Sequence, residues 1–160
     1  VRGGGRAGGE YAALLDEYAV AAGWSVGAFR QLGRLRAPGL WPGMERSVSA
    51  TAQLRDGGEL LVATEEGAIV GSVVYCAPGA MKQDSFPEDW AYMRVLAVPP
   101  RYRRRGVARA RLHTCLNLAR SDGVKKFGLR TSEAMTEAVE LYDTQKFKRV
   151  RGISKVYGFR

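Results

Sequence analysis

Residues Leu96 to Leu112 read LAVPPRYRRRGVARARL, and this stretch decides the fold. An apolar run is broken by two prolines and then by Arg103-Arg104-Arg105-Gly106, after which apolar residues return at helical spacing. A strand therefore gives way to a helix, with much positive charge at the junction. Three interpretations fit: a nucleic-acid-binding surface, a solvated basic face, or a pocket for a polyanionic small molecule.

The third interpretation has a specific physical basis at this junction. The first turn of a helix presents unpaired backbone N–H groups and about half a positive charge, which together bind phosphate. Gly106 lets a ligand approach the backbone closely, and arginine guanidinium groups form paired hydrogen bonds with pyrophosphate oxygens. Taken alone, a solvated basic face explains the arginines equally well.

The composition is typical of an ordinary globular protein. Of 160 residues, 46% are hydrophobic and 26% charged, and the formal net charge of +9 is compatible with polyanionic partners. We expect one domain over residues 1–160, with 1–9 flexible. We expect it in the cytoplasm, because no hydrophobic signal region or membrane-length apolar run occurs. Cys76 and Cys115 are expected to be reduced core residues, and no metal site is expected.

Hydrophobic spacing predicts the elements around the quoted stretch. Apolar residues from Tyr11 to Ala22 recur at helical spacing, which predicts an N-terminal helix. The stretch 27–48, broken by Gly and Pro, predicts loops with one or two short helical pieces. Two β-rich runs separated by Glu65-Glu66-Gly67 predict a hairpin. From there we expect the hairpin at 59–77, a strand at 90–98, a helix at 106–123, a strand at 125–130, a helix at 133–145 and a closing strand pair at 147–159.

The helix after Gly106 determines the expected topology. Its apolar stripe, Ala108, Leu112, Cys115 and Ala119, predicts packing against a sheet, and Gly123 is suited to a left-handed cap. A strand, helix and strand in succession predict one parallel crossover inside an otherwise antiparallel sheet. This is an α+β architecture and not a doubly wound dinucleotide-binding sheet.

The order of motifs resembles that of a known family. Over roughly residues 59–150 several motifs follow one another. They are a strand VLAV, the Arg-x-x-Gly-x-Ala spacing of Arg103, Gly106 and Ala108, an amphipathic helix, LRT on a strand, and AVELY…KF. This order resembles the GCN5-related N-acetyltransferase (GNAT) superfamily. The resemblance implies the GNAT fold: a mixed, mostly antiparallel sheet, a central parallel strand pair splayed at the cofactor site, and helices on both faces.

The resemblance also implies acetyl-CoA as the cosubstrate. The turn from Arg103 to Ala108 would hold its pyrophosphate through backbone amides, and the strand end from Leu96 to Val98 would pair with the pantetheine arm. An amide near Val98 would polarise the thioester carbonyl. The implied cofactor-binding residues are Leu96, Ala97, Val98, Arg103, Arg104, Arg105, Gly106, Val107 and Ala108.

Tyr142 lies in AVELYDTQKF, which resembles the family's Ala-x-x-x-Leu-Tyr-x-x-x-Gly-Phe signature. In the family this hydroxyl often protonates the departing CoA thiolate, so the resemblance implies a catalytic Tyr142; core packing is the alternative. Two residues depart from the pattern. Lys146 replaces the glycine before Phe147, which predicts a changed loop shape. Met135 replaces an asparagine that contacts the cofactor in many members, which predicts loss of that contact.

The general base is harder to assign. An attacking amine must lose a proton, usually to a carboxylate or through water. Glu88 and Asp89 precede the third predicted strand and are candidates, with two solvated loop acids as the alternative; together with Asp84 they would attract a cationic amine. His113 is expected to be structural or surface-exposed. Trp41 fits either an acceptor pocket or the core.

We therefore expect an acyl-CoA-dependent N-acyltransferase that moves acetyl directly to the amine of a small molecule or peptide in a ternary complex. No covalent enzyme intermediate is implied. Two alternatives stay open: a basic nucleic-acid-binding module and a catalytically idle GNAT-like CoA-binding protein. Seven arginines and no acid between Arg94 and Arg111 favour the first, although aromatic residues for base stacking are scarce there. The acceptor, the acyl length and the oligomeric state, a homodimer included, stay open; no membrane partner is expected.

Overall fold

A mixed β-sheet organises the described part of the chain, which in this computed structural model comprises residues 10–12, 58–80, 86–150 and 153–158. The strands follow the order β1-β2-β3-β4-β5-β7-β6 across the sheet. All neighbouring pairs are antiparallel except β4 and β5, which are parallel. The strands are β1 (Glu10–Ala12), β2 (Glu59–Glu65), β3 (Ala68–Cys76), β4 (Ala91–Ala97), β5 (Lys126–Leu129), β6 (Lys148–Val150) and β7 (Ile153–Gly158).

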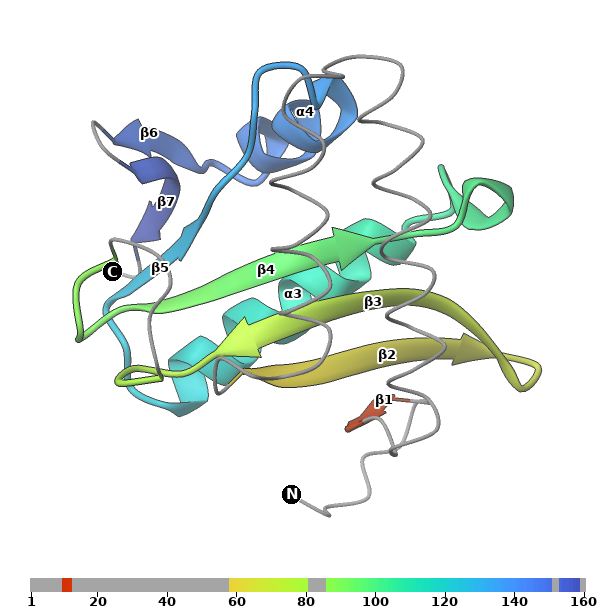
Figure 1. Cartoon of the computed structure of the whole chain (residues 1–160), viewed down its shortest axis with the longest axis horizontal. Coiled ribbons are helices and arrows are strands. Elements are labelled where there is room, and N and C mark those ends of the chain that lie inside the picture. Colours follow the sequence, from red (N-terminus) through yellow and green to blue (C-terminus); the bar gives the residue numbers. More distant parts are fainter. Residues whose placement is uncertain (1–9, 13–57, 81–85, 151–152, 159–160) are drawn as a thin grey trace, which may run out of the picture.

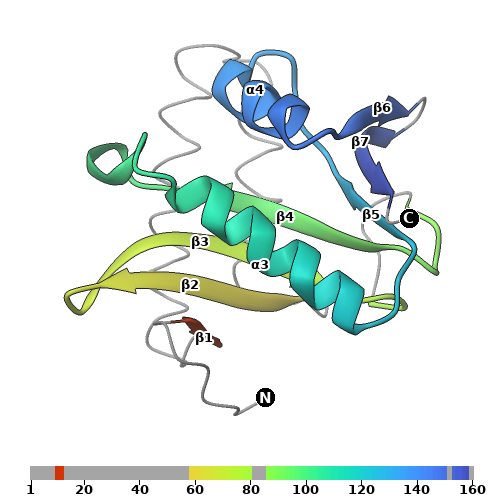
Figure 2. The ribbon, with the colours of Figure 1, turned by 180° about the vertical axis from the view of Figure 1, so that it is seen from behind.

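The parallel pair exists because a helix connects β4 to β5. After β4 the chain forms the short 3-10 helix η2 (Pro100–Tyr102) and then α3 (Val107–Ser121), and α4 (Thr136–Thr144) follows β5. Figures 1 and 2 show α3 lying along one face of the sheet across β2, β3 and β4. The predicted single parallel crossover, the mostly antiparallel sheet and the α+β class are confirmed.

One apolar cluster joins this face of the sheet to α3 and α4. Its α3 residues are Leu112, Cys115, Leu116 and Ala119, all buried. Three of them belong to the predicted apolar stripe, whereas its first residue, Ala108, is only partly buried. The C-terminal end of α3 is capped by Gly123, whose φ of 71° is left-handed. The predicted glycine cap is therefore confirmed.

A tight hairpin and a close helix contact hold the start of α3 beside the end of β4. Glu66 and Gly67 connect β2 to β3 with φ of 49° and 78°, the pair of positive values that a two-residue hairpin turn requires. At Gly71 on β3, an added Cβ would lie 2.6 Å from Val107 Cγ1. The first residue of α3 thus packs directly on the β3 backbone.

The opposite face of the sheet carries a second apolar cluster that includes Cys76, Phe86, Trp90 and Tyr92. Both described α-helices, α3 and α4, pack against the first cluster. Cys76 and Cys115 are both buried and are not joined in a disulfide, as expected. Within the described ranges, no helix has the length and apolar character that crossing a bilayer requires.

The expectation of a helix from Tyr11 is wrong at its start. Residues Glu10–Ala12 form β1, which pairs antiparallel with β2 and places Tyr11 opposite Val62. An unpaired edge strand such as β2 offers a row of backbone hydrogen-bonding groups, and pairing with them outweighs the local helical spacing. Residues 13–22, the loops expected at 27–48 and the segment 1–9 lie outside the described residues.

Candidate functional site

The parallel strands β4 and β5 separate in the middle of β4. Their register pairs end at Met93 opposite Leu129, where β5 stops, while β4 continues to Ala97. Figures 1 and 2 show the two strands diverging, one toward η2 and the other toward α4. The predicted splay is therefore present, and it leaves the β4 segment from Leu96 to Val98 beyond the end of its parallel neighbour.

A bulge turns β4 at the same place. Three steps along β4, from Arg94 to Ala97, lie opposite two steps along β3, from Val74 to Ser72. Val95 within this bulge has a φ of 52°. A β-branched residue at positive φ is a genuine outlier that costs about 1–3 kcal/mol. Strain of this size, placed where the strands part, indicates a functional constraint on the backbone.

The arginine turn has the backbone shape of an anion-binding site. The φ values alternate in sign, from −66° at Arg103 to 61° at Arg104, a negative value at Arg105, and 85° at Gly106. Arg103 itself is extended, with a ψ of 162°, so the left-handed residues Arg104 and Gly106 form a turn directly before α3, and turns of this kind can direct backbone N–H groups toward an anion. Gly106 is the N-cap of α3, has no side chain with which to cap the helix, and accepts the first helical hydrogen bond from Ala110 N. The early N–H groups of α3 therefore remain for a ligand.

The side chains of the turn are partly held by the protein itself. Arg103 Nε donates to the Val98 carbonyl oxygen at 3.2 Å, which fixes the turn against the end of β4. Arg105 Nη2 donates to Glu65 Oε1 at 2.8 Å and lies over the Tyr102 ring. The predicted residues Leu96 to Val98 and Arg103 to Ala108 are thus brought together at one end of the sheet. No feature of the sequence indicates the contact between Arg105 and Glu65.

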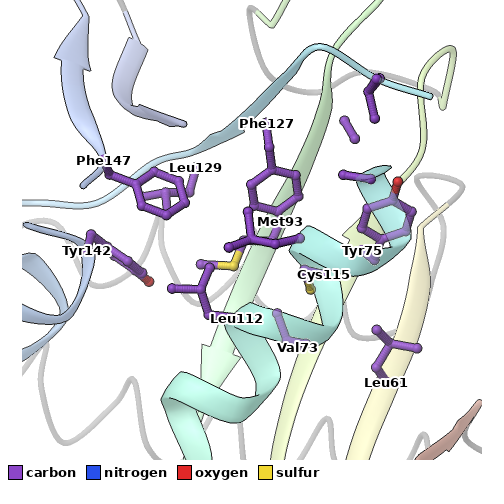
Figure 3. Packing of buried hydrophobic residues seen from close by; sticks show 14 residues of the cluster. Leu61, Val73, Tyr75, Met93, Leu112, Cys115, Phe127, Leu129, Tyr142 and Phe147 are labelled. Carbon is purple, nitrogen blue, oxygen red and sulfur yellow. The ribbon is translucent and has the colours of Figure 1, made fainter. Parts of the chain in front are cut away.

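Tyr142 lies in the core beside the point where the strands separate. It is 5% exposed and shares the first apolar cluster with Met93 and Leu129, the last paired residues of β4 and β5. Figure 3 shows its ring extending from α4 toward α3, on the side of Leu112. Burial, with a smaller contribution from Cys115, raises the pKa of the Tyr142 hydroxyl well above its usual value near 10. The hydroxyl therefore keeps its proton at neutral pH, as a proton donor must.

A helix cap fixes the ring of Tyr142. Phe147 N donates to Tyr142 O at 3.0 Å and Lys146 N donates to Asp143 O at 3.0 Å, the two hydrogen bonds of a Schellman motif. The Phe147 and Tyr142 rings form the apolar contact that accompanies this motif, with centroids 5.8 Å apart. Lys146 adopts the left-handed conformation that glycine would have, with a φ of 64°. The expected change in loop shape is therefore wrong.

Several other predicted residues lie away from this site. Glu88 and Asp89 are exposed and precede Ala91, the first residue of β4, whereas the arginine turn follows its last residue. The seven residues of β4 span about 20 Å, so the structure does not bring Glu88 to the turn. His113 is exposed on α3, as expected. Trp41 and Asp84 lie outside the described residues, and the residues that are described contain no cluster able to hold a metal ion.

Comparison with known proteins agrees with this geometry. The sequence profile of the acetyltransferase (GNAT) family matches residues 28–147 of the chain. None of the curated proteins compared with the chain matches it.

Solved structures share the fold at low sequence identity. The PaiA N-acetyltransferase from Thermoplasma acidophilum, in complex with coenzyme A, gives a TM-score of 0.70 at 11% identity, over 92% of this chain and 94% of that one. A GNAT family acetyltransferase from Brucella melitensis, in complex with acetyl-CoA, gives a TM-score of 0.62 at 16% identity, over 94% of this chain and 87% of that one. An acetyltransferase-like protein from Pyrococcus horikoshii gives a TM-score of 0.60 at 18% identity. The match covers 94% of this chain but only 47% of that longer protein.

Proposed function

This chain belongs to the acetyltransferase (GNAT) family, and we propose that it transfers an acetyl group from acetyl-CoA directly to an acceptor amine. One observation carries the proposal. The free end of β4 beyond its last pair with β5 leads directly into the turn before α3, and Tyr142 shares an apolar cluster with Met93 and Leu129, the last paired residues of the two strands.

The turn and the strand end would bind the two halves of the cofactor. In this proposal the N–H groups from Arg103 to Ala108 bind the pyrophosphate, assisted by the positive end of the α3 dipole. The pantetheine arm, which carries amide groups, pairs with the backbone of Leu96 to Val98 beyond the end of β5. The bulge at Val95 changes the direction of β4 immediately before this segment.

The chemistry follows from this placement. The amine nitrogen attacks the thioester carbonyl carbon, and the backbone amide near Val98 stabilises the negative charge that develops on the oxygen. The carbon–sulfur bond then breaks, and the Tyr142 hydroxyl donates its proton to the sulfur. The proton lost by the amine goes to water. We assign this role to water and not to Glu88, because Glu88 lies at the other end of β4.

The nucleic-acid alternative finds less support in the placement of the arginines. Arg111 is 3% exposed and donates to the Val62 carbonyl oxygen, and Arg105 is paired with Glu65. Arginines directed into the protein or to a carboxylate make a weaker phosphate-binding surface than the sequence alone suggests. The cytoplasmic location and the single domain stay predictions.

A pair of titrations followed by an assay tests the proposal. Acetyl-CoA and a single-stranded RNA oligonucleotide are each titrated calorimetrically into the protein, and CoA release is then measured over a panel of amines. We expect saturable acetyl-CoA binding and amine-dependent CoA release. RNA binding without acetyl-CoA binding would establish the alternative, and acetyl-CoA binding without release for any amine would indicate an idle CoA-binding member.

A further inference from the structure

The arginine turn is attached to the β2–β3 hairpin by an ion pair. Glu65 is the last residue of β2 and lies opposite Ala68 across the tight turn of the hairpin. Its Oε1 accepts a hydrogen bond from Arg105 Nη2 at 2.8 Å, and the two side chains are 49% and 50% exposed. Because so short a turn fixes the end of β2, the Glu65 carboxylate gives Arg105 a partner at a fixed place.

An aromatic ring provides Arg105 with a second contact. The guanidinium carbon of Arg105 lies 5.7 Å from the centroid of the Tyr102 ring, within the distance at which a cation and a ring attract each other. Tyr102 is the last residue of η2, directly before the turn. One guanidinium group therefore connects three segments of the chain: the hairpin, η2 and the turn itself.

The turn needs such contacts because its backbone is strained. Arg104 has a φ of 61°, and a residue with a Cβ keeps this conformation only where the surrounding structure holds it there. The residues on either side of Arg104 provide that support. Arg103 donates to the Val98 carbonyl oxygen, and Arg105 donates to Glu65. Without the contact to Glu65, Arg104 can relax to a negative φ, and the turn loses the shape proposed for binding pyrophosphate.

We propose that Glu65 is a positioning residue for the cofactor: through Arg105 it holds the turn in the shape that binds pyrophosphate, without itself touching the cofactor. This inference rests on the proposed function. The opposite role for the same contact is competition, in which Glu65 occupies a guanidinium group that would otherwise bind the phosphates. The two roles predict opposite results. Removal of Glu65 weakens cofactor binding if Glu65 positions the turn, because fewer molecules have the binding conformation. It strengthens binding if Glu65 competes, because a negative charge near the phosphates is lost.

Calorimetric titration with acetyl-CoA distinguishes the two roles. Glu65→Ala should raise the Kd by about 3- to 5-fold, the upper part of the range for an exposed ion pair. Glu65→Gln keeps an oxygen that can accept from Arg105 and should bind nearly as tightly as the wild type. The matched control is Glu133→Ala, which breaks the exposed ion pair of Glu133 with Arg149 on β6 and should leave the Kd unchanged. A Kd that is unchanged or lower in Glu65→Ala would overturn the inference.

A second measurement needs no cofactor. In the unliganded protein, NMR order parameters report how rigidly each backbone N–H group is held. Glu65→Ala should lower the order parameters of Arg104, Arg105 and Gly106 from about 0.85 toward the value of about 0.6 that marks flexible backbone, whereas Glu133→Ala should not change them. Unchanged order parameters in Glu65→Ala would overturn the inference. Absence of acetyl-CoA binding by the wild-type protein would instead overturn the proposed function.

Discussion

Tyr142 owes its position to the loop that follows α4 as much as to α4 itself. The Schellman hydrogen bonds from Lys146 N and Phe147 N close the helix, and the Phe147 ring contacts the Tyr142 ring. The spacing of Tyr142 and Phe147 in the sequence is therefore a packing requirement. A proton donor needs such fixed geometry, because misplacement by a fraction of an ångström weakens proton transfer.

Removing the hydroxyl tests the role of Tyr142. Tyr142→Phe should lower kcat by roughly 10- to 10⁴-fold, the range for a positioned proton donor, with little change in the Kd of acetyl-CoA. Steady-state kinetics and calorimetry measure the two effects separately. A variant that turns over at the wild-type rate would show that Tyr142 only packs in the core.

Lys146 provides a stability test of the cap. Because its φ of 64° is unfavourable for a side chain with a Cβ, Lys146→Gly should raise the free energy of unfolding by about 1 kcal/mol. Urea denaturation measures this change. The matched variant is Lys125→Gly, at another exposed lysine, which lacks a positive φ and should gain nothing. Equal effects of both variants would contradict the assignment of strain to Lys146.

Among the elements, the junction of β4 and α3 forms the turn that we propose binds the pyrophosphate. Gly71 allows Val107 to pack on β3, so α3 starts beside the end of β4, and Arg103 ties the turn to Val98. The turn around Gly106 was predictable from sequence, because a glycine at a helix start follows three consecutive arginines. The bulge was not predictable, because a valine at positive φ runs against its own backbone preference.

A charge at Gly106 tests this junction. Gly106→Glu should raise the Kd of acetyl-CoA by at least about 100-fold, since it places a negative charge at the N-terminus of α3 and strains a left-handed residue. The control is Gly123→Glu at the other end of α3. Gly123 also has positive φ and open space around its Cβ position, so the control should lose stability but keep its affinity. Similar affinities of the two variants for acetyl-CoA would remove the turn from the site.

For the whole molecule, the succession of elements and the one parallel crossover could be predicted from residue 59 onward, but the place of β7 between β5 and β6 could not. Alternation, glycine turns and the amphipathic stripe of α3 each specify a local structure, and a right-handed crossover leaves few ways to arrange them. The helix predicted from Tyr11 is wrong at its start because β1 exists only through pairing with β2, a contact between distant parts of the chain.

The burial of Tyr142 links the site to the stability of the whole fold. Since burial raises its pKa in the folded state, the neutral hydroxyl stabilises the fold fully below pH 10, and this stabilisation is lost as the pH rises above 10. The loss for one group has a limiting slope of about 1.4 kcal/mol per pH unit. Denaturation of the wild-type protein and Tyr142→Phe between pH 8 and about pH 11 should show a steeper decline for the wild type. Parallel curves would contradict the buried, neutral hydroxyl.

The most direct test of the account is a crystal structure of the protein with acetyl-CoA. We expect the pyrophosphate to lie within hydrogen-bond distance of N–H groups between Arg103 and Ala108. The pantetheine arm should lie along Leu96 to Val98, and the sulfur should lie within reach of the Tyr142 hydroxyl. Acetyl-CoA bound elsewhere on the protein, or with its sulfur away from the opening between β4 and β5, would contradict it.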